Sequence, residues 1–498
     1  MRPRGLSPEI QIVTGLSPEG PPLHTRIYRQ LREHILAGAL APGARLPSAR
    51  TLASDLGVSR NTVESAFGQL VAEGFLVRRV GSGSEVAASL ADAVPFARRP
   101  GAPRNRRPDT PARPPRLSAR GTLMARSGQA EIDSDLFGGP GATNVAGFPR
   151  RTWNRFLARR ARRGGVAILG SAAPAGLLEL RRQIAEYATL ARGLRCAPEQ
   201  VLVVGSTQQA IDLAARVLLD PGDEALVEEP GYSGARAALL AAGARVRGLP
   251  VDGDGLVTDA LPEEGAARRL LYLTPSHQFP LGVTLALARR LAVLAWARRA
   301  AAWVIEDDYD SEFRYDGRPL AALHALDTAE RVLYVGTYNK VLFPGLRLAY
   351  LILPAALVDP FAAARRIVDG HSPPLAQAAL ADFMASGQFA LYMRQARQHY
   401  GEKRDLLVAR ATRAWGGHVR LGPSSTGLHL VAHLAPGTDD RAMAAAARES
   451  GLGIGPLSRY YAGSRGEPGL VLSYGGSSHA GIARGVDRLT PLLRSEKS

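Results

Sequence analysis

The chain has 498 residues, 46% of them hydrophobic, and a formal net charge of +17 at pH 7. This length allows two or three domains with buried cores. The single cysteine, Cys196, excludes an intramolecular disulfide and a cysteine-based metal site; it fits the reducing cytoplasm, and we expect no metal. The start of the chain, MRPRGLSPEI, lacks the apolar segment of a signal peptide, and no stretch reaches the roughly 18 apolar residues of a membrane span. The excess of basic residues is compatible with a polyanionic partner, but a general preference for arginine would explain it equally well.

Residues 21–84 form the first predicted domain, with three helices followed by a two-stranded hairpin. In LHTRIYRQLREHILAG every fourth residue is apolar from Leu23 onward, which predicts the first helix. Ser48 and Ser59 are candidate N-caps of two more helices, SARTLASDLG and SRNTVESAFGQLVAEG, joined by a short turn at Gly57. This arrangement is typical of a helix-turn-helix, and FLVRRVGSGSEV predicts a wing with a glycine-rich tip.

Polar side chains at the start of the third predicted helix could reach base edges or phosphates of DNA, although each arginine alone is equally compatible with a solvated surface charge. The segment LPSARTLASDLGVSRNTVESAFGQLVAEGFLVRRVGSGSEV resembles the winged-helix domain of the GntR superfamily. The resemblance implies binding to double-stranded operator DNA. Glu64 departs from the pattern, because some members carry a basic residue there. The predicted DNA-binding residues are Arg50, Ser59, Arg60, Asn61, Thr62, Gly81 and Ser82.

A proline- and arginine-rich stretch, residues 85–130, separates this domain from the rest of the chain. It has few large apolar residues and cannot bury enough surface to fold, which predicts a linker. In residues 131–490, apolar runs such as VLVVG, EALVEE, LLYLTP, WVIEDDY and VLYVGT alternate with alanine-rich helical segments. This alternation predicts an α/β domain with a mostly parallel sheet.

Lys340 stands out in the segment GTYNKVLFPGLRLAY, because only three of the 62 basic residues of the chain are lysines. A lysine amine can lose its proton and form a Schiff base with pyridoxal phosphate, whereas arginine stays protonated. That cofactor needs a carboxylate at its ring nitrogen, a donor at its 3′ oxygen, a stacking ring and a phosphate cradle. Asp307, Tyr309 and Tyr232 are candidates for the first three roles. The candidate phosphate ligands are Ser206, Thr207, Thr337 and Arg347.

Five longer motifs carry a further resemblance: GSAAPAGLLELRRQIAEY, GSTQQAIDLAARVLLDPGDEALVEEPGYSG, TPSHQFPLG, VIEDDYDSEFRY and GTYNKVLFPGLRLAY. Their order along the chain resembles that in fold-type I aminotransferases, and their amino-acid sequences are similar to those of the MocR subfamily of GntR regulators. The resemblance implies a winged helix joined to an aminotransferase-like domain with a large and a small subdomain, and it makes Lys340 the Schiff-base lysine. The cofactor-binding residues that it implies are Ser206, Thr207, Gln208, Tyr232, His277, Asp307, Tyr309, Thr337, Asn339, Lys340 and Arg347. His277 is equally compatible with a packed loop residue.

Three positions depart from the family pattern, and one of them bears on activity. Leu281 and Asn339 stand where threonine and serine are common, and neither removes a required charge. Val471 stands where aminotransferases carry the arginine that binds the substrate carboxylate. Either Arg459 or Arg465 replaces that arginine, or the ligand is not an amino acid. We therefore expect at most residual transamination.

Three functions are compatible with these patterns. We favour a transcription regulator that senses pyridoxal phosphate, alone or together with an amine or amino acid. The alternatives are a working aminotransferase with an ancillary DNA-binding domain, and a DNA-binding protein with a vestigial, cofactor-free domain. The resemblance also implies a homodimer, in a head-to-tail arrangement that the long linker permits. The effector, the operator and the direction of regulation do not follow from the sequence.

Overall fold

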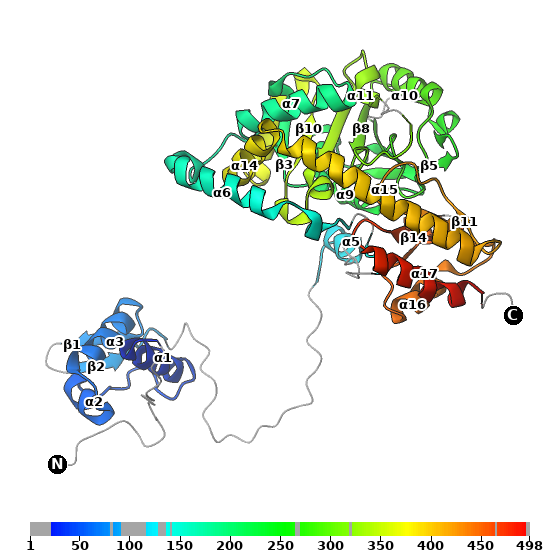
Figure 1. Ribbon diagram of the computed structural model, residues 1–498. Helices are drawn as coiled ribbons and strands as arrows, with labels where there is room; N and C mark the ends of the chain where they lie inside the picture. Colours follow the sequence, from blue (N-terminus) through cyan, green and yellow to red (C-terminus); the bar gives the residue numbers. More distant parts are fainter. Residues whose placement is uncertain are drawn as a thin grey trace. The chain divides into compact units, whose positions relative to one another are not determined.

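The computed structural model of the protein describes residues 21–79, 83–90, 116–127, 136–139, 142–263, 269–317, 321–463 and 466–494 (Figure 1). The chain divides into two compact units, Met1–Pro115 and Arg116–Ser498. Gly81 and Ser82, which were predicted to contact DNA at the wing tip, lie outside the described residues. None of the helices in the described ranges is both long enough and apolar enough to cross a membrane.

The first unit contains three helices and a two-stranded antiparallel hairpin, in the order that the sequence predicts. Its elements are α1 (Leu23–Leu36), α2 (Ala49–Leu56), α3 (Arg60–Ala72), β1 (Leu76–Arg79) and β2 (Gly83–Val86). One face of each helix packs into a shared core, which buries Ile27, Leu52, Val63 and Phe67. Val86 of β2 also lies in this core, so the folded unit continues beyond residue 84, where the sequence placed its end.

Local signals set the ends of the helices in the helix-turn-helix. The Ser48 hydroxyl accepts a hydrogen bond from the Thr51 amide at 3.1 Å, and the Ser59 hydroxyl accepts one from the Thr62 amide at 3.2 Å. Both serines satisfy a free N–H group at a helix start, as predicted. Gly57 ends α2 with a φ of 65°, a left-handed conformation that glycine adopts without steric cost.

The second unit is built on an eight-stranded sheet in the order β3-β10-β9-β8-β7-β4-β5-β6. Its strands are β3 (Val201–Val204), β4 (Glu224–Glu229), β5 (Arg245–Asp252), β6 (Gly255–Leu256), β7 (Arg269–Leu273), β8 (Trp303–Asp308), β9 (Val332–Thr337) and β10 (Ala349–Ile352). β4, β5, β7, β8 and β9 pair in parallel, whereas β10 is antiparallel to both of its neighbours and β6 is antiparallel to β5. The prediction of an α/β fold with a mostly parallel sheet is confirmed.

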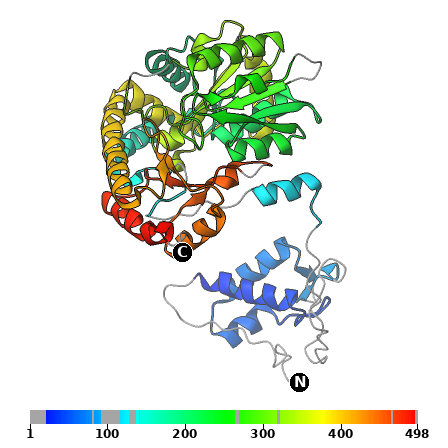
Figure 2. The same ribbon diagram turned by 90° about the vertical axis from the view of Figure 1, so that its right-hand side faces the viewer.

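Helices cover both faces of this sheet, as the view turned by 90° in Figure 2 shows. The helices of the second unit are α5 (Ala119–Ser127), α6 (Arg150–Arg163), α7 (Leu178–Arg192), α8 (Thr207–Leu218), α9 (Ser233–Ala241), α10 (Leu287–Arg299), α11 (Leu323–Leu326), α12 (Tyr338–Val341), α13 (Val358–Val368), α14 (Pro374–Ala385), α15 (Gln388–Trp415), α16 (Asp440–Glu449) and α17 (His479–Arg494). α8, α9 and α13 pack on the face that carries Leu270 and Ile305. α10 packs on the opposite face, against Leu271 and Val304, and α7 and α14 cover that same face beside Tyr334.

A smaller antiparallel sheet forms the second subdomain of this unit, in the order β11-β12-β14-β13. Its strands are β11 (Arg420–Leu421), β12 (His429–His433), β13 (Gly455–Pro456) and β14 (Gly469–Ser473). The long helix α15 connects the two subdomains, because Tyr400 belongs to the core of the large one and Trp415 to the core of the small one. α5 forms inside the stretch that the sequence analysis took for a linker, and α17 continues past residue 490.

Candidate functional site

A pocket lies at the carboxyl-terminal ends of the parallel strands in the second unit. Its lining residues are Thr207, Tyr232, Tyr272, Thr274, Phe279, Asp307, Tyr309 and Lys340. Thr207 begins α8 after β3, Asp307 lies at the end of β8, and Lys340 lies in α12 directly after β9. Ligand-binding side chains collect at this edge because the loops that follow parallel strands all leave the sheet there.

Five of the predicted cofactor-binding residues meet in this pocket, although they come from separate segments of the chain. They are Thr207, Tyr232, Asp307, Tyr309 and Lys340. The Lys340 amine lies 4.5 Å from the centre of the Tyr309 ring. The Tyr232 ring stands 5.9 Å from the Phe279 ring and nearly perpendicular to it. The pocket therefore combines one amine, one carboxylate and several aromatic rings.

Asp307 is the buried carboxylate of the pocket, with 4% of its surface exposed. Its Oδ2 accepts a hydrogen bond from the Tyr272 hydroxyl at 2.6 Å, while its Oδ1 has no hydrogen-bond partner among the described residues. Burial raises the pKa of Asp307 to about 7, against the opposing effects of the Tyr272 hydrogen bond and the Lys340 charge. A buried carboxylate oxygen without a partner is suited to accept a hydrogen bond from an N–H group of a ligand.

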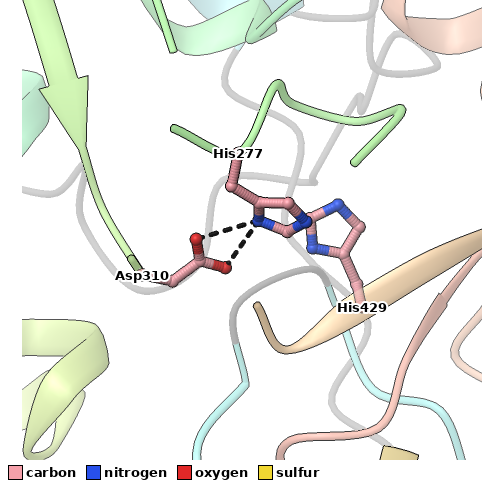
Figure 3. Close-up of side chains that lie close together, drawn as sticks. All are labelled: His277, Asp310 and His429. Carbon is pink, nitrogen blue, oxygen red and sulfur yellow. Dashed lines mark hydrogen bonds and ion pairs between the residues drawn. The ribbon is translucent and has the colours of Figure 1, made fainter. Parts of the chain in front are cut away.

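Behind the pocket, three buried side chains from different segments lie together: His277, Asp310 and His429 (Figure 3). The His277 Nδ1 is 2.9 Å from an Asp310 carboxylate oxygen and therefore carries the proton that this oxygen accepts. The Tyr309 hydroxyl lies 3.0 Å from the same nitrogen and donates to the His277 carbonyl oxygen, also at 3.0 Å. Burial lowers the pKa of His429 to about 3, which keeps this histidine neutral. His277 thus contacts Tyr309 from behind and does not line the pocket.

These three side chains are of the types that bind metals, and one ligand atom from each lies within 4.8 Å of the others. Two of the nitrogens are already engaged, because His277 Nδ1 bonds Asp310 and the His429 Nε2 lies 3.1 Å from the Pro280 carbonyl oxygen. We therefore interpret the group as a hydrogen-bonded support for Tyr309.

Sequence reasoning missed four residues of the site: Glu228, Tyr272, Thr274 and Phe279. The buried Glu228 carboxylate accepts hydrogen bonds from the Thr274 amide at 3.0 Å and from the Thr274 hydroxyl at 2.7 Å. Burial raises the pKa of Glu228 to about 7. The available signal was a tyrosine and a threonine in the otherwise apolar run LLYLTP, which had been interpreted only as a buried strand.

Ser206 and Gln208, both predicted to bind the cofactor, form hydrogen bonds within the protein that stabilise the turn between β3 and α8. The Ser206 hydroxyl caps α8 by accepting from the Gln209 amide at 3.2 Å. The Gln208 amide group donates to the Gly234 carbonyl oxygen and accepts from the Tyr232 hydroxyl at 3.2 Å. Gln208 therefore positions the ring that was predicted to stack on the cofactor.

The other three predicted residues lie around the segment that carries Lys340, outside the pocket lining. The Thr337 hydroxyl accepts from the Asn339 amide at 3.2 Å and caps α12. The Asn339 side chain donates to the Gly205 carbonyl oxygen and accepts from the Leu348 amide, each at 3.0 Å, so it ties together the two loops beside the pocket. Arg347 is exposed and adopts a left-handed backbone conformation with a φ of 54°.

Val471 lies in β14 and is 1% exposed, in a small apolar cluster with Val431 and Leu457. Of the two arginines considered as substitutes for the missing one, Arg459 is exposed, and Arg465 lies outside the described residues. Val471 thus puts a buried apolar side chain at the position where an arginine was expected.

On the first unit, the residues predicted to contact DNA lie at the start of α3 and beside it. Arg50, Ser59, Arg60 and Asn61 are exposed, whereas Thr62 is half-buried and its hydroxyl lies 2.8 Å from the Ser59 hydroxyl. These two hydroxyls form the cap of α3, and the arginines and Asn61 remain accessible to a ligand.

A groove runs between α2, α3 and the hairpin, and four arginines lie along it: Arg50, Arg60, Arg78 and Arg79. Glu64 lies in the same groove. Its carboxylate is 2.7 Å from the Arg78 guanidinium and 4.0 Å from that of Arg60. Glu85 pairs with Arg79 at 2.7 Å, so two acids face four arginines and the groove keeps a positive charge, which favours a polyanion.

Comparison with known proteins identifies two domain families in the chain. Residues 23–86 match the family model "Bacterial regulatory proteins, gntR family", and residues 158–489 match "Aminotransferase class I and II". The probable rhizopine catabolism regulatory protein MocR of Rhizobium meliloti is 40% identical over 94% of this chain and 93% of its own length. The pyridoxine biosynthesis transcriptional regulator PdxR of Corynebacterium glutamicum is 32% identical over 92% of this chain and 94% of its own length.

A solved structure is similar to the second unit. The α-aminoadipate aminotransferase LysN of Thermus thermophilus superimposes with a TM-score of 0.68 at 30% sequence identity, over 75% of this chain and 97% of that protein. That structure was determined with N-(5′-phosphopyridoxyl)-L-leucine.

Proposed function

Since the chain belongs to the MocR-type regulators, which join a GntR-family DNA-binding domain to an aminotransferase class I and II domain, we propose that its second unit senses pyridoxal phosphate and thereby controls DNA binding. The DNA-binding regulator itself follows from the family, in which relatives across the full length are transcriptional regulators. The cofactor, the effector and the assembly are the parts that we propose.

The observation that carries the cofactor proposal is that one pocket holds an amine together with a buried carboxylate, one oxygen of which has no hydrogen-bond partner among the described residues. Pyridoxal phosphate supplies an aldehyde that condenses with a primary amine and a ring nitrogen that needs a carboxylate partner. Lys340 is the amine of the pocket, and Asp307 Oδ1 is the acceptor without a partner in the described part of the chain. A vestigial domain has no reason to keep this destabilising buried carboxylate.

The same geometry supports the remaining contacts that we propose for the cofactor. Tyr309 would donate to the 3′ oxygen once its hydroxyl proton turns away from the His277 carbonyl oxygen, and Tyr232, held by Gln208, would stack on the ring. The phosphate would bind at the start of α8, where Ser206, Thr207 and the free amide groups lie, with Arg347 as the counter-charge. His277 and Asp310 would keep the Tyr309 hydroxyl oriented.

Regulation requires that a ligand prefer one arrangement of the protein over another. We propose a primary amine or amino acid as the second ligand, a homodimer with one winged helix for each half-site of the operator, and a head-to-tail arrangement of its chains. Binding to chromosomal DNA supports a cytoplasmic location. We expect at most residual transamination, because no cationic group other than Lys340 is among the lining residues.

The test compares the wild-type protein with Lys340→Ala and Lys340→Arg. The wild type is expected to develop the visible absorbance of bound pyridoxal phosphate, and its affinity for a DNA fragment selected from a random library is expected to change with the cofactor. Both variants should lose the absorbance and the cofactor dependence, while basal DNA binding persists. Lys340→Arg keeps the positive charge but lacks the primary amine, so it distinguishes the effect of losing the amine from the effect of losing the charge. A Lys340→Ala protein with intact cofactor-dependent control would refute the proposal.

A further inference from the structure

The wall of the pocket on the side of the small subdomain is aromatic and apolar. The Phe279 ring lines the pocket and stands 5.1 Å from the Tyr460 ring, at a nearly perpendicular angle. The Gly231 amide donates to the Tyr460 carbonyl oxygen at 3.1 Å, which ties this segment to the loop that carries Tyr232. Tyr460 is not itself a lining residue; we call the Phe279 ring and the Tyr460 ring behind it the aromatic wall.

The aromatic wall is backed by the apolar cluster of the small subdomain. Val431, Leu457 and Val471 are each 1% exposed or less, and Leu281 and Tyr460 pack against them. A ligand that extends from the cofactor towards the small subdomain therefore meets the Phe279 ring, which this apolar cluster and the Tyr460 ring support from behind. Such a surface stabilises apolar groups and offers no counter-charge to a carboxylate.

The titratable side chains at and beside the pocket are mainly acidic. Three buried carboxyl groups surround it: Asp307, Glu228 and Asp310 are 4%, 3% and 1% exposed. Lys340 is the only cationic side chain among the lining residues, and it is assigned to the cofactor. Arg347 is assigned to the phosphate, and Arg459 is exposed.

A carboxylate on the ligand would thus lose its hydration next to the aromatic wall, and no cationic side chain among the lining residues is left to pair with it. An amine faces neither penalty. It keeps its nitrogen at the Lys340 side and buries its apolar part against the Phe279 face of the aromatic wall.

We propose that the ligand recognised beside the cofactor is a primary amine that carries an apolar or aromatic substituent and no carboxylate. This inference rests on the proposed function, because it assumes that the cofactor occupies the pocket at Lys340. It goes beyond that proposal by choosing one class of effector from the amines and amino acids.

The test uses two ligands that differ by one carboxylate, 2-phenylethylamine and L-phenylalanine, with the full-length protein loaded with pyridoxal phosphate. Binding is measured by calorimetry and by the change in cofactor absorbance. The amine is expected to bind at least about tenfold more tightly than the amino acid, a conservative difference for one unpaired carboxylate. Equal or tighter binding of L-phenylalanine overturns the inference. A protein that never acquires cofactor absorbance instead refutes the proposed function, so the two failures are distinct.

A variant tests whether the aromatic wall carries this preference. Tyr460 is half-buried, so Tyr460→Arg places a guanidinium at the wall without inserting a charge into the core, and Tyr460→Phe is the matched control. The arginine is expected to narrow or reverse the preference by improving the affinity for L-phenylalanine, whereas the phenylalanine variant keeps it. Melting temperatures check that both variants fold. An unchanged preference in a folded Tyr460→Arg protein would overturn the assignment of this wall.

Discussion

The winged-helix unit and the pocket of the second unit use charged side chains in opposite ways. On the winged helix, Arg50 and Arg60 are exposed, and the Glu64 side chain is 34% exposed between two arginines. In the pocket, Asp307 and Glu228 are almost fully buried, and burial raises the pKa of each to about 7. Water and salt screen the charges on the winged helix, whereas the ionisation of the buried carboxyl groups depends on the side chains that surround them.

This difference determines how strongly each region responds to a single substitution. Exposed ion pairs contribute little individually, and a surface that binds a polyanion shares the work among several arginines. A buried charge has few partners, and removal of one of them leaves a costly unsatisfied group. Substitutions in the pocket should therefore have larger effects than substitutions in the groove of the first unit.

Asp307→Asn should have a larger effect than any single substitution in the groove. It keeps the shape and the contact with Tyr272 but removes the charge that would pair with the ring nitrogen of the cofactor. Hydrogen bonds to charged groups contribute about 1.5–3 kcal/mol, so cofactor affinity should fall roughly 10- to 100-fold in an absorbance titration. Asp254→Asn, on an exposed loop, is the control and should bind as the wild type does. If Asp307→Asn bound the cofactor as tightly as the wild type does, Asp307 would not be the partner of the ring nitrogen.

The pH dependence of stability provides the second way to separate the two regions. The pKa values of Asp307 and Glu228 are about 7 in the folded protein, above the ordinary values near about 4. Between these values the folded state binds more protons than the unfolded state, so stability falls as the pH rises from about 4 to 7. Burial raises the pKa values of Glu306 and Glu312 to about 7 as well, and they act in the same direction.

The melting temperature of the cofactor-free protein should therefore be lower at pH 7.5 than at pH 5.5. Combining Asp307→Asn with Glu228→Gln should flatten the curve but not abolish its slope, since Glu306 and Glu312 remain. The exposed Asp254→Asn control should follow the wild type. A double variant with the wild-type slope would mean that the two carboxyl groups are ionised in the folded protein, which would contradict the contrast between the regions.

The sequence predicted those features that depend on local signals. Ser48, Gly57 and Ser59 mark helix ends because a cap acts within three or four residues, and the structure has the ends of α2 and α3 there. Asp307 and Lys340 lie at or just after the carboxyl ends of predicted strands, and they meet in one pocket because parallel strands end at the same edge of the sheet. The contact between Tyr272 and Asp307 depends instead on the pairing of β7 with β8, which no local pattern reveals.

Features that join distant segments were missed for the same reason. His277, Asp310 and His429 come from two loops and a strand of the other subdomain, so only the folded chain places them together. α5 was missed because the surrounding proline- and arginine-rich composition outweighed a short helix-compatible run. Val471 shows the opposite case. The sequence identified the missing charge, and the structure supplied its apolar surroundings.

Glu64→Gln should produce the smallest effect, and its direction sharpens the contrast. Glu64 holds Arg78 at 2.7 Å and lies 4.0 Å from Arg60, so its removal frees two cations in the groove. An exposed pair contributes about 0.2–1 kcal/mol, which predicts a gain of only a few-fold in affinity for random-sequence duplex DNA at low salt. The slope of log affinity against log salt should steepen by up to about one unit for each arginine that gains a phosphate.

Fluorescence anisotropy at several salt concentrations measures both quantities. Glu73→Gln is the matched control, because Glu73 pairs with Arg32 and Tyr28 at the opposite end of α3 and should leave the slope unchanged. A different result would break the comparison. If Glu64→Gln weakened binding to a selected operator and left random DNA unaffected, the carboxylate would be reading a base. One exposed charge of the first unit would then be as specific in its contacts as the buried charges of the pocket.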